Sequence, residues 1–76
     1  MPKEVFAGIT VDPQVMGGRP VIKGTRIPIE VVVGELAGGS SFDDIVAGYR
    51  LSMDEIRAAL GYAAELLSAT AVYAAG

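Results

Sequence analysis

Apolar residues in the second half of the chain recur at the spacing of an α-helix. The first set, at positions i, i+3, i+4 and i+7, consists of Ile29, Val32, Val33 and Leu36. The β-branched residues here favour a strand by propensity, but the period of the pattern indicates a helix. Pro28 suits the first helical position and Gly38-Gly39 suits the end. The pattern therefore predicts a helix from Pro28 to Leu36.

The same spacing continues after the glycine pair. Ser41 is a suitable N-cap, and the carboxylates of Asp43 and Asp44 suit the positively polarised first turn of a helix. The apolar face of this predicted second helix consists of Phe42, Ile45, Val46 and Tyr49. The connector Arg50-Leu51 then leads directly into the next helical signal, so the two helices must cross at a steep angle, as in a helix-turn-helix unit.

The third helix is predicted from Met53 to about Ala69. Ser52 and Glu55 form a capping-box pattern at its start, in which each side chain can bond to the other's backbone N–H. The apolar face of this helix consists of Ile56, Ala59, Leu60, Ala63 and Leu67. The exposed face is expected to include Asp54, Arg57, Tyr62 and Glu65.

The first part of the chain predicts β-structure. Ile9-Thr10-Val11 is a short strand, ended by Asp12-Pro13. Val21-Ile22 and Arg26-Ile27 are expected to pair as a tight hairpin around a left-handed Gly24. The fold class is therefore mainly α, in one domain: an N-terminal β-hairpin segment at 1–27, followed by a three-helix, helix-turn-helix-like bundle at 28–76.

Composition favours a binding module over an enzyme. Hydrophobic residues make up 51% of the 76, and the mean hydropathy is +0.45, more apolar material than one small core can hide. We therefore expect a homo-oligomer, most simply a dimer. The sequence has no histidine, which is the commonest general base and metal ligand, and no cysteine, which supplies thiolate ligands. We therefore expect no catalysis, cofactor or metal. Neither a signal peptide nor a membrane span is indicated, which predicts a cytoplasmic protein.

The charge is unevenly distributed. Residues 1–29 carry four basic and two acidic side chains, a net +2, whereas residues 30–76 carry two basic and seven acidic ones, a net −5. The candidate DNA-phosphate contacts are Arg19, Lys23, Arg26 and Arg57. The alternative is that these side chains form ion pairs with the acidic helices, and Arg26 is the one that suits a structural role best. The acidic start of the third helix is a poor surface for reading DNA.

The end of the third helix is the candidate partner surface, because aromatic and apolar residues are enriched at protein interfaces. The candidate dimer or partner contacts are Tyr62, Leu66, Val72 and Tyr73.

The glycine-containing turn does not match a nucleotide-binding motif. In the order Lys23-Gly24-Thr25 the lysine precedes the glycine, whereas in a phosphate-binding P-loop it follows the glycine.

Two blocks of the sequence resemble a known family. The segment GGRPVIKGTRIP, residues 17–28, resembles the signature of a bacterial and archaeal family, domain of unknown function 433, and SMDEIRAALGYA, residues 52–63, looks like its second block. The resemblance covers about residues 9–67 and implies a homeodomain-like helical bundle with an N-terminal hairpin. Some members resemble, or serve as, VapB-type antitoxins paired with a PIN-domain ribonuclease toxin. Antitoxins commonly carry a long polar tail, where this chain has a short Ala-rich segment at 69–76.

These observations lead to two hypotheses. The first is an antitoxin-like, dimeric helix-turn-helix protein that binds double-stranded DNA, a toxin partner, or both. The second is a protein-interaction or assembly module with no role in nucleic-acid binding, which the acidic helices and the apolar surplus support.

Overall fold

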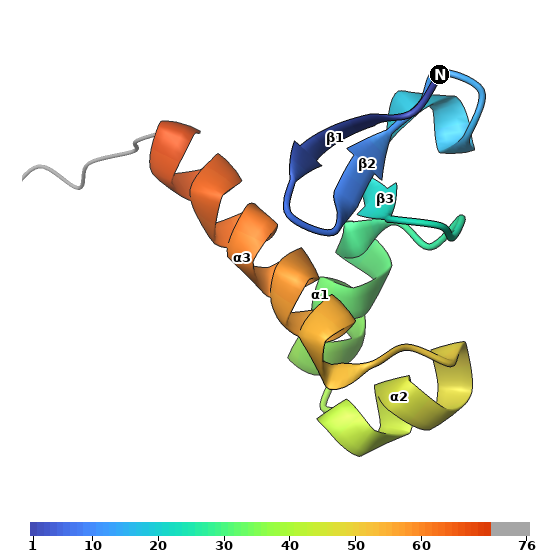
Figure 1. The fold of residues 1–76 in the computed structure, drawn as a ribbon. Helices are drawn as coiled ribbons and strands as arrows, with labels where there is room; N and C mark the ends of the chain where they lie inside the picture. Colours follow the sequence, from blue (N-terminus) through green and yellow to red (C-terminus); the bar gives the residue numbers. More distant parts are fainter. Residues whose placement is uncertain (71–76) are drawn as a thin grey trace, which may run out of the picture.

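The computed structural model describes residues 1–70 as a small sheet and three α-helices built around one core (Figure 1). The elements in chain order are β1 (Lys3–Phe6), β2 (Ile9–Val11), the 3-10 turn η1 (Met16–Gly18), β3 (Val21–Ile22), α1 (Ile29–Ala37), α2 (Phe42–Tyr49) and α3 (Met53–Thr70). The predicted fold class, mainly helical with β-structure at the N-terminus, is confirmed. Among the described helices, none is both long and apolar enough to cross a membrane.

The sheet is antiparallel throughout, with the strand order β1-β2-β3. Ile9 lies opposite Ile22, and Thr10 lies opposite Val21. Because side chains alternate between the two faces of a strand, the Ile9–Ile22 pair faces the core while the Thr10–Val21 pair faces the other way. The sheet therefore separates the hydrophobic core from a second surface.

Two details of the predicted β-structure are wrong. The strand β1 was not predicted, and the second arm of the predicted hairpin, Arg26-Ile27, is not a strand. The two arms do pair, because the Ile22 N–H donates to the Ile27 carbonyl at 3.0 Å and Val21 forms an antiparallel bridge with Pro28. Gly24 is left-handed as expected, with φ +79°, but the Thr25 hydroxyl donates to the Ile22 carbonyl and accepts from the Ile27 N–H, at 2.7 and 3.0 Å. These side-chain bonds stabilise a compact turn, and the pairing beyond it ends at the Val21–Pro28 bridge because α1 begins at Ile29.

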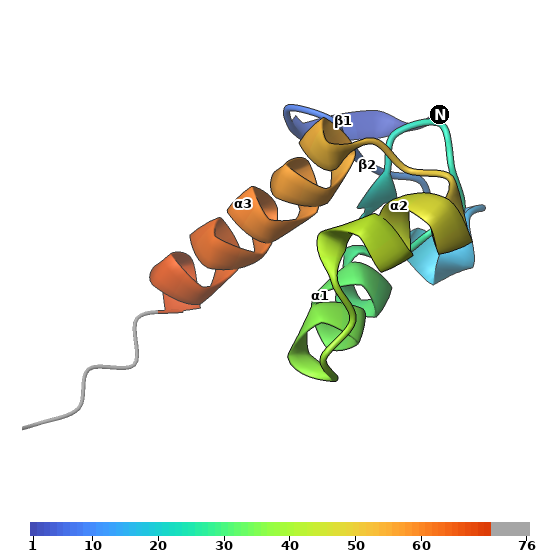
Figure 2. The same cartoon turned by 90° about the horizontal axis from the view of Figure 1, so that it is seen from below.

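The three predicted helices are confirmed. Pro28 is the N-cap of α1 instead of its first residue, a shift of one position. Ser41 caps α2 in a reciprocal capping box with Asp44. Ser52 and Glu55 form the same arrangement at the start of α3: the Glu55 N–H donates to the Ser52 hydroxyl at 3.1 Å, and the Ser52 N–H donates to the Glu55 carboxylate at 2.8 Å. Arg50, with φ +57°, ends α2 in the left-handed conformation and turns the chain into α3. The helices α2 and α3 cross at a steep angle (Figures 1 and 2).

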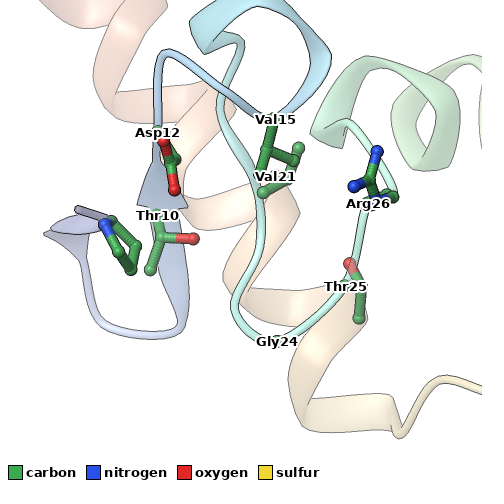
Figure 3. A pocket seen from close by; sticks show the side chains of 8 residues that line it. Thr10, Asp12, Val15, Val21, Gly24, Thr25 and Arg26 are labelled. Carbon is green, nitrogen blue, oxygen red and sulfur yellow. The ribbon is translucent and has the colours of Figure 1, made fainter.

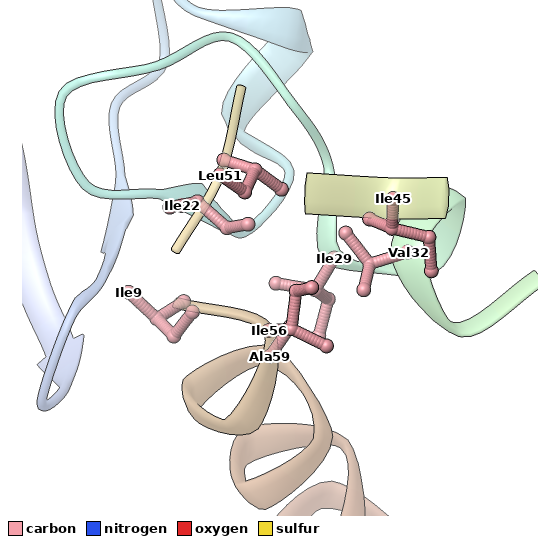
Figure 4. Packing of buried hydrophobic residues seen from close by; sticks show 8 residues of the cluster. All are labelled: Ile9, Ile22, Ile29, Val32, Ile45, Leu51, Ile56 and Ala59. Carbon is pink, nitrogen blue, oxygen red and sulfur yellow. The ribbon is translucent and has the colours of Figure 1, made fainter. Parts of the chain in front are cut away.

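One hydrophobic core joins the sheet to all three helices. Figure 4 shows Ile56 and Ala59 of α3 beside Ile29, between the sheet residues and the residues of α1 and α2. The buried members of the core are Ile9, Ile22, Ile29, Val32, Ile45, Leu51, Ile56 and Ala59. The fully buried residues of α3 come from its first half. Tyr62 and Ala63 pack partly against the core, and the last turns of the helix extend away from the sheet (Figure 2).

Candidate functional site

Three of the four basic side chains predicted to contact DNA are in exposed ion pairs. Arg19 contacts Glu30 of α1 at 3.4 Å, and Lys23 contacts Glu4 of β1 at 3.1 Å. Arg57 contacts Asp54, one turn earlier in α3, at 3.6 Å. Exposed ion pairs of this kind contribute about 0–1 kcal/mol, so they can open, but a phosphate would have to compete with a carboxylate at each position.

Glu4 links the sheet to the turn that follows β3. Its carboxylate accepts a hydrogen bond from the Gly8 N–H at 3.0 Å and another from the Lys23 ammonium. The Gly8 N–H, and then Lys23, hold the pKa of Glu4 below its usual value because both interactions favour the ionised form. Lys23 is therefore paired with Glu4, which lies in the same N-terminal segment, the part of the chain with net positive charge.

Arg26 differs from the expectation that it is the most structural of the basic residues. It is exposed, and it forms no ion pair with any residue in 1–70. The three ion pairs of Arg19, Lys23 and Arg57 share no residue, so the structure does not join the four predicted contacts into one network. The reason is that each acidic partner comes from a different element: α1, β1 or α3 itself.

The start of α3 would be the DNA-reading surface in a helix-turn-helix protein. Its exposed side chains include Met53 and Asp54 as well as Arg57. Asp54 holds Arg57 in an ion pair, and Glu55 is committed to the cap at Ser52. Within residues 1–70 no three acidic side chains gather into a metal-ligating group. The start of α3 is therefore acidic at the end that would approach phosphates in such a protein.

The predicted partner residues of α3 have different environments. Tyr62 is half-buried, and its ring packs against Phe6 with 5.7 Å between the centroids. A side chain at Gly61 would approach the same Phe6 ring to 3.1 Å, so this glycine admits β1 against the helix. Leu66 is 43% exposed. Val72 and Tyr73 lie outside the described residues.

An apolar groove of about 430 Å³ runs between α1 and the second half of α3. Pro20, Ile29 and Val33 line one side, with Glu30 at the rim. The other side consists of Ala63, Leu66 and Leu67. Of these residues, sequence reasoning identified only Leu66 as a partner contact. The apolar stripe of α3 was predicted as far as Leu67, but the sequence did not reveal that the stripe leaves the core before Leu67, which is 74% exposed.

Comparison with known proteins gives one family and several relatives. The family described as "Protein of unknown function (DUF433)" matches residues 9–63, which run from β2 into α3. An uncharacterised protein of Sinorhizobium fredii, y4eO, is 36% identical over 56 residues, which are 72% of this chain and 25% of that protein.

Two crystal structures are similar to this fold. A DUF433 member protein from Anabaena variabilis has a TM-score of 0.73 and 30% identity, over 76% of this chain and 58% of that chain. Rv2018 from Mycobacterium tuberculosis has a TM-score of 0.64 and 31% identity, over 71% of this chain and 25% of that one. The chain thus spans a quarter of y4eO and of Rv2018, which extend well beyond the shared domain.

Proposed function

This chain belongs to the DUF433 family, and we propose that it is a non-catalytic protein-interaction module that pairs with a second copy of itself through the groove between α1 and α3. The observation that carries this proposal is the exposure of Leu67. The stripe that buries Ile56 and Ala59 completely continues along α3, yet Leu67 at the same face of the helix is 74% exposed. An apolar stripe that outlasts its own core supports coverage by another chain.

The groove and the exposed leucine complement each other. Leu67 projects from the α3 side of the groove, whose other side consists of aliphatic side chains such as Ile29 and Val33. In a two-fold dimer, each copy supplies both surfaces, so one contact is made twice. Burying one leucine side chain contributes about 1.5–3 kcal/mol. The apolar surplus of the composition, 51% hydrophobic residues, fits the same arrangement.

Sedimentation equilibrium tests this proposal. We expect the purified chain to show a reversible, concentration-dependent monomer–dimer equilibrium, because the apolar surface on each copy is available to the other. A chain that stays folded and monomeric up to about 1 mM, where association would be weaker than about 4 kcal/mol, contradicts self-pairing.

DNA binding by α2, the turn and α3 is the second candidate function. The left-handed Arg50 and the steep crossing of the two helices favour it, since this geometry places a helix for groove contact. In the antitoxin-like form of this function, the dimer binds double-stranded DNA, and a PIN-domain toxin is the additional partner. Arg26, which has no ion pair in the described residues, is then the basic side chain that reaches a phosphate at least cost.

The second candidate makes a measurable prediction. Binding to the DNA upstream of the gene should be saturable, and the logarithm of the association constant should fall with the logarithm of the salt concentration by about 0.9 per phosphate contacted. The double substitution Arg19→Glu and Lys23→Glu should weaken DNA binding relative to the unaltered chain. Glu65→Gln, which lies outside the basic segment, is the control and should not weaken it. Absence of saturable binding at about 50 mM salt by a folded sample excludes this candidate.

A further inference from the structure

A second hollow, of about 350 Å³, lies on the side of the sheet that faces away from the core. Figure 3 shows Thr10 and Asp12 on one side of it, Thr25 and Arg26 on the other, and Val15 and Val21 between them. Its volume is at the lower end of the range for sites of small ligands. It is separated by the sheet from the groove between α1 and α3, so it is independent of the proposed dimer surface.

Thr10 is the buried polar side chain of this hollow. It is only 7% exposed, and no residue of 1–70 forms a hydrogen bond with its hydroxyl. Among the described residues, every side-chain oxygen that is completely shielded from solvent has a hydrogen-bond partner. The Thr10 oxygen has no such partner, so it is not completely shielded, and the hollow that Thr10 lines gives access to it. Figure 3 shows the hydroxyl pointing into the hollow. The Thr10 hydroxyl is therefore available to bond to a ligand in the hollow.

Asp12 and Arg26 place opposite charges on the two sides of the hollow. One carboxylate oxygen of Asp12 accepts the Gln14 N–H at 2.9 Å, and the other has no donor among the described residues. Arg26 has no acidic partner there, and no ion pair joins it to Asp12. Opposite charges that line one hollow without neutralising each other can each bind a group of a ligand.

We infer that this hollow binds a small zwitterion, with its ammonium at Asp12 and Thr10 and its carboxylate at Arg26. A simple anion would be repelled by Asp12, and a simple cation by Arg26, so a molecule with both charges fits best. Val15 and Val21 form an apolar surface for the part between the charged ends. A free amino acid and a short peptide share this chemistry and differ in the distance that separates their charges.

Amide chemical-shift titration of the ¹⁵N-labelled full chain tests the inference and separates the two sources. The zwitterionic probes are glycine and triglycine, and the singly charged probes are acetate and ethylammonium. We expect saturable shifts at Thr10, Gly24 and Arg26 with glycine if the ligand is an amino acid, or with triglycine if it is a peptide. No saturation by either zwitterion at about 20 mM, or equal affinity for acetate, overturns the inference.

Three substitutions assign the roles of the side chains. Asp12→Asn and Arg26→Gln remove one charge each, and we expect each substitution to lower the affinity for the zwitterion by about tenfold or more. Thr10→Val preserves the shape of the side chain and removes only the hydroxyl, and Thr10→Ser should restore affinity if valine abolishes it. Arg50→Gln makes the same change of charge at a residue that does not line the hollow. Equal loss of affinity in Arg26→Gln and Arg50→Gln would mean that only overall charge matters, which contradicts a site.

Discussion

Replacing Ile56 by alanine is expected to lower the free energy of unfolding by about 3 kcal/mol. Ile56 has no exposed surface and lies where α3 meets both the sheet and α1 (Figure 4). The substitution removes buried methyl and methylene groups and leaves a cavity that the surrounding residues fill only in part. Since a domain of this length has about 4–11 kcal/mol of stability in total, the loss is a large fraction of it. Urea denaturation followed by circular dichroism measures the effect.

Two controls separate this core effect from a general effect of altering α3. Ile56→Val removes a single methylene group and should cost about 0.5–1.5 kcal/mol. Leu67→Ala removes a larger apolar side chain from an exposed position, and in dilute, monomeric protein it should cost less than about 0.5 kcal/mol. If Ile56→Ala and Leu67→Ala destabilise the monomer equally, the division of α3 into a buried and a projecting half is wrong.

The second large effect is expected from Leu67→Glu, which should weaken self-association by at least about a hundredfold. The substitution removes the apolar side chain and puts a carboxylate where the dimer would bury it, and the two-fold symmetry applies both changes twice. Because Leu67 is exposed in the single chain, the fold should be retained. Sedimentation equilibrium gives the association constant, and circular dichroism gives the helix content.

Ala69→Glu is the matched control for this charge. It adds the same carboxylate two residues further along α3, on the opposite side of the helix from Leu67, and its position is also exposed. We expect the dimer of this variant to dissociate much less than that of Leu67→Glu. If both variants dissociate to the same extent, the loss comes from the added negative charge, and the groove is not the contact.

The parts of the fold that the sequence predicted are those that depend on neighbours along the chain. The N-cap at Ser41 and the capping box at Ser52 are complete within four residues, and the period of α1 outweighed its β-branched composition. The strand β1 could not be predicted in this way. It exists because Gly8, at φ +86°, turns the chain back on β2, and because Phe6 packs against α3 far along the sequence.

The candidate sites were predictable only in part, for the same reason. The basic residues were identified by type, but their pairing with Glu30 and Glu4 depends on how α1 and β1 pack. Leu66 was found from its place at the end of α3, whereas the opposite wall of the groove, with Val33, comes from a helix that the sequence assigned to the core. The hollow at Thr10 was not predicted, because its two sides come from a strand and from a turn after β3.

The most direct test of the central proposal is a search for nuclear Overhauser effects between copies in a dimer made from two differently labelled samples. The proposal predicts contacts between the Leu67 methyl groups of one copy and the methyl groups of Val33 or Ile29 of the other, since these side chains line the groove. A dimer whose intermolecular contacts come only from other surfaces, with the Leu67 methyl groups in contact with solvent alone, would contradict it.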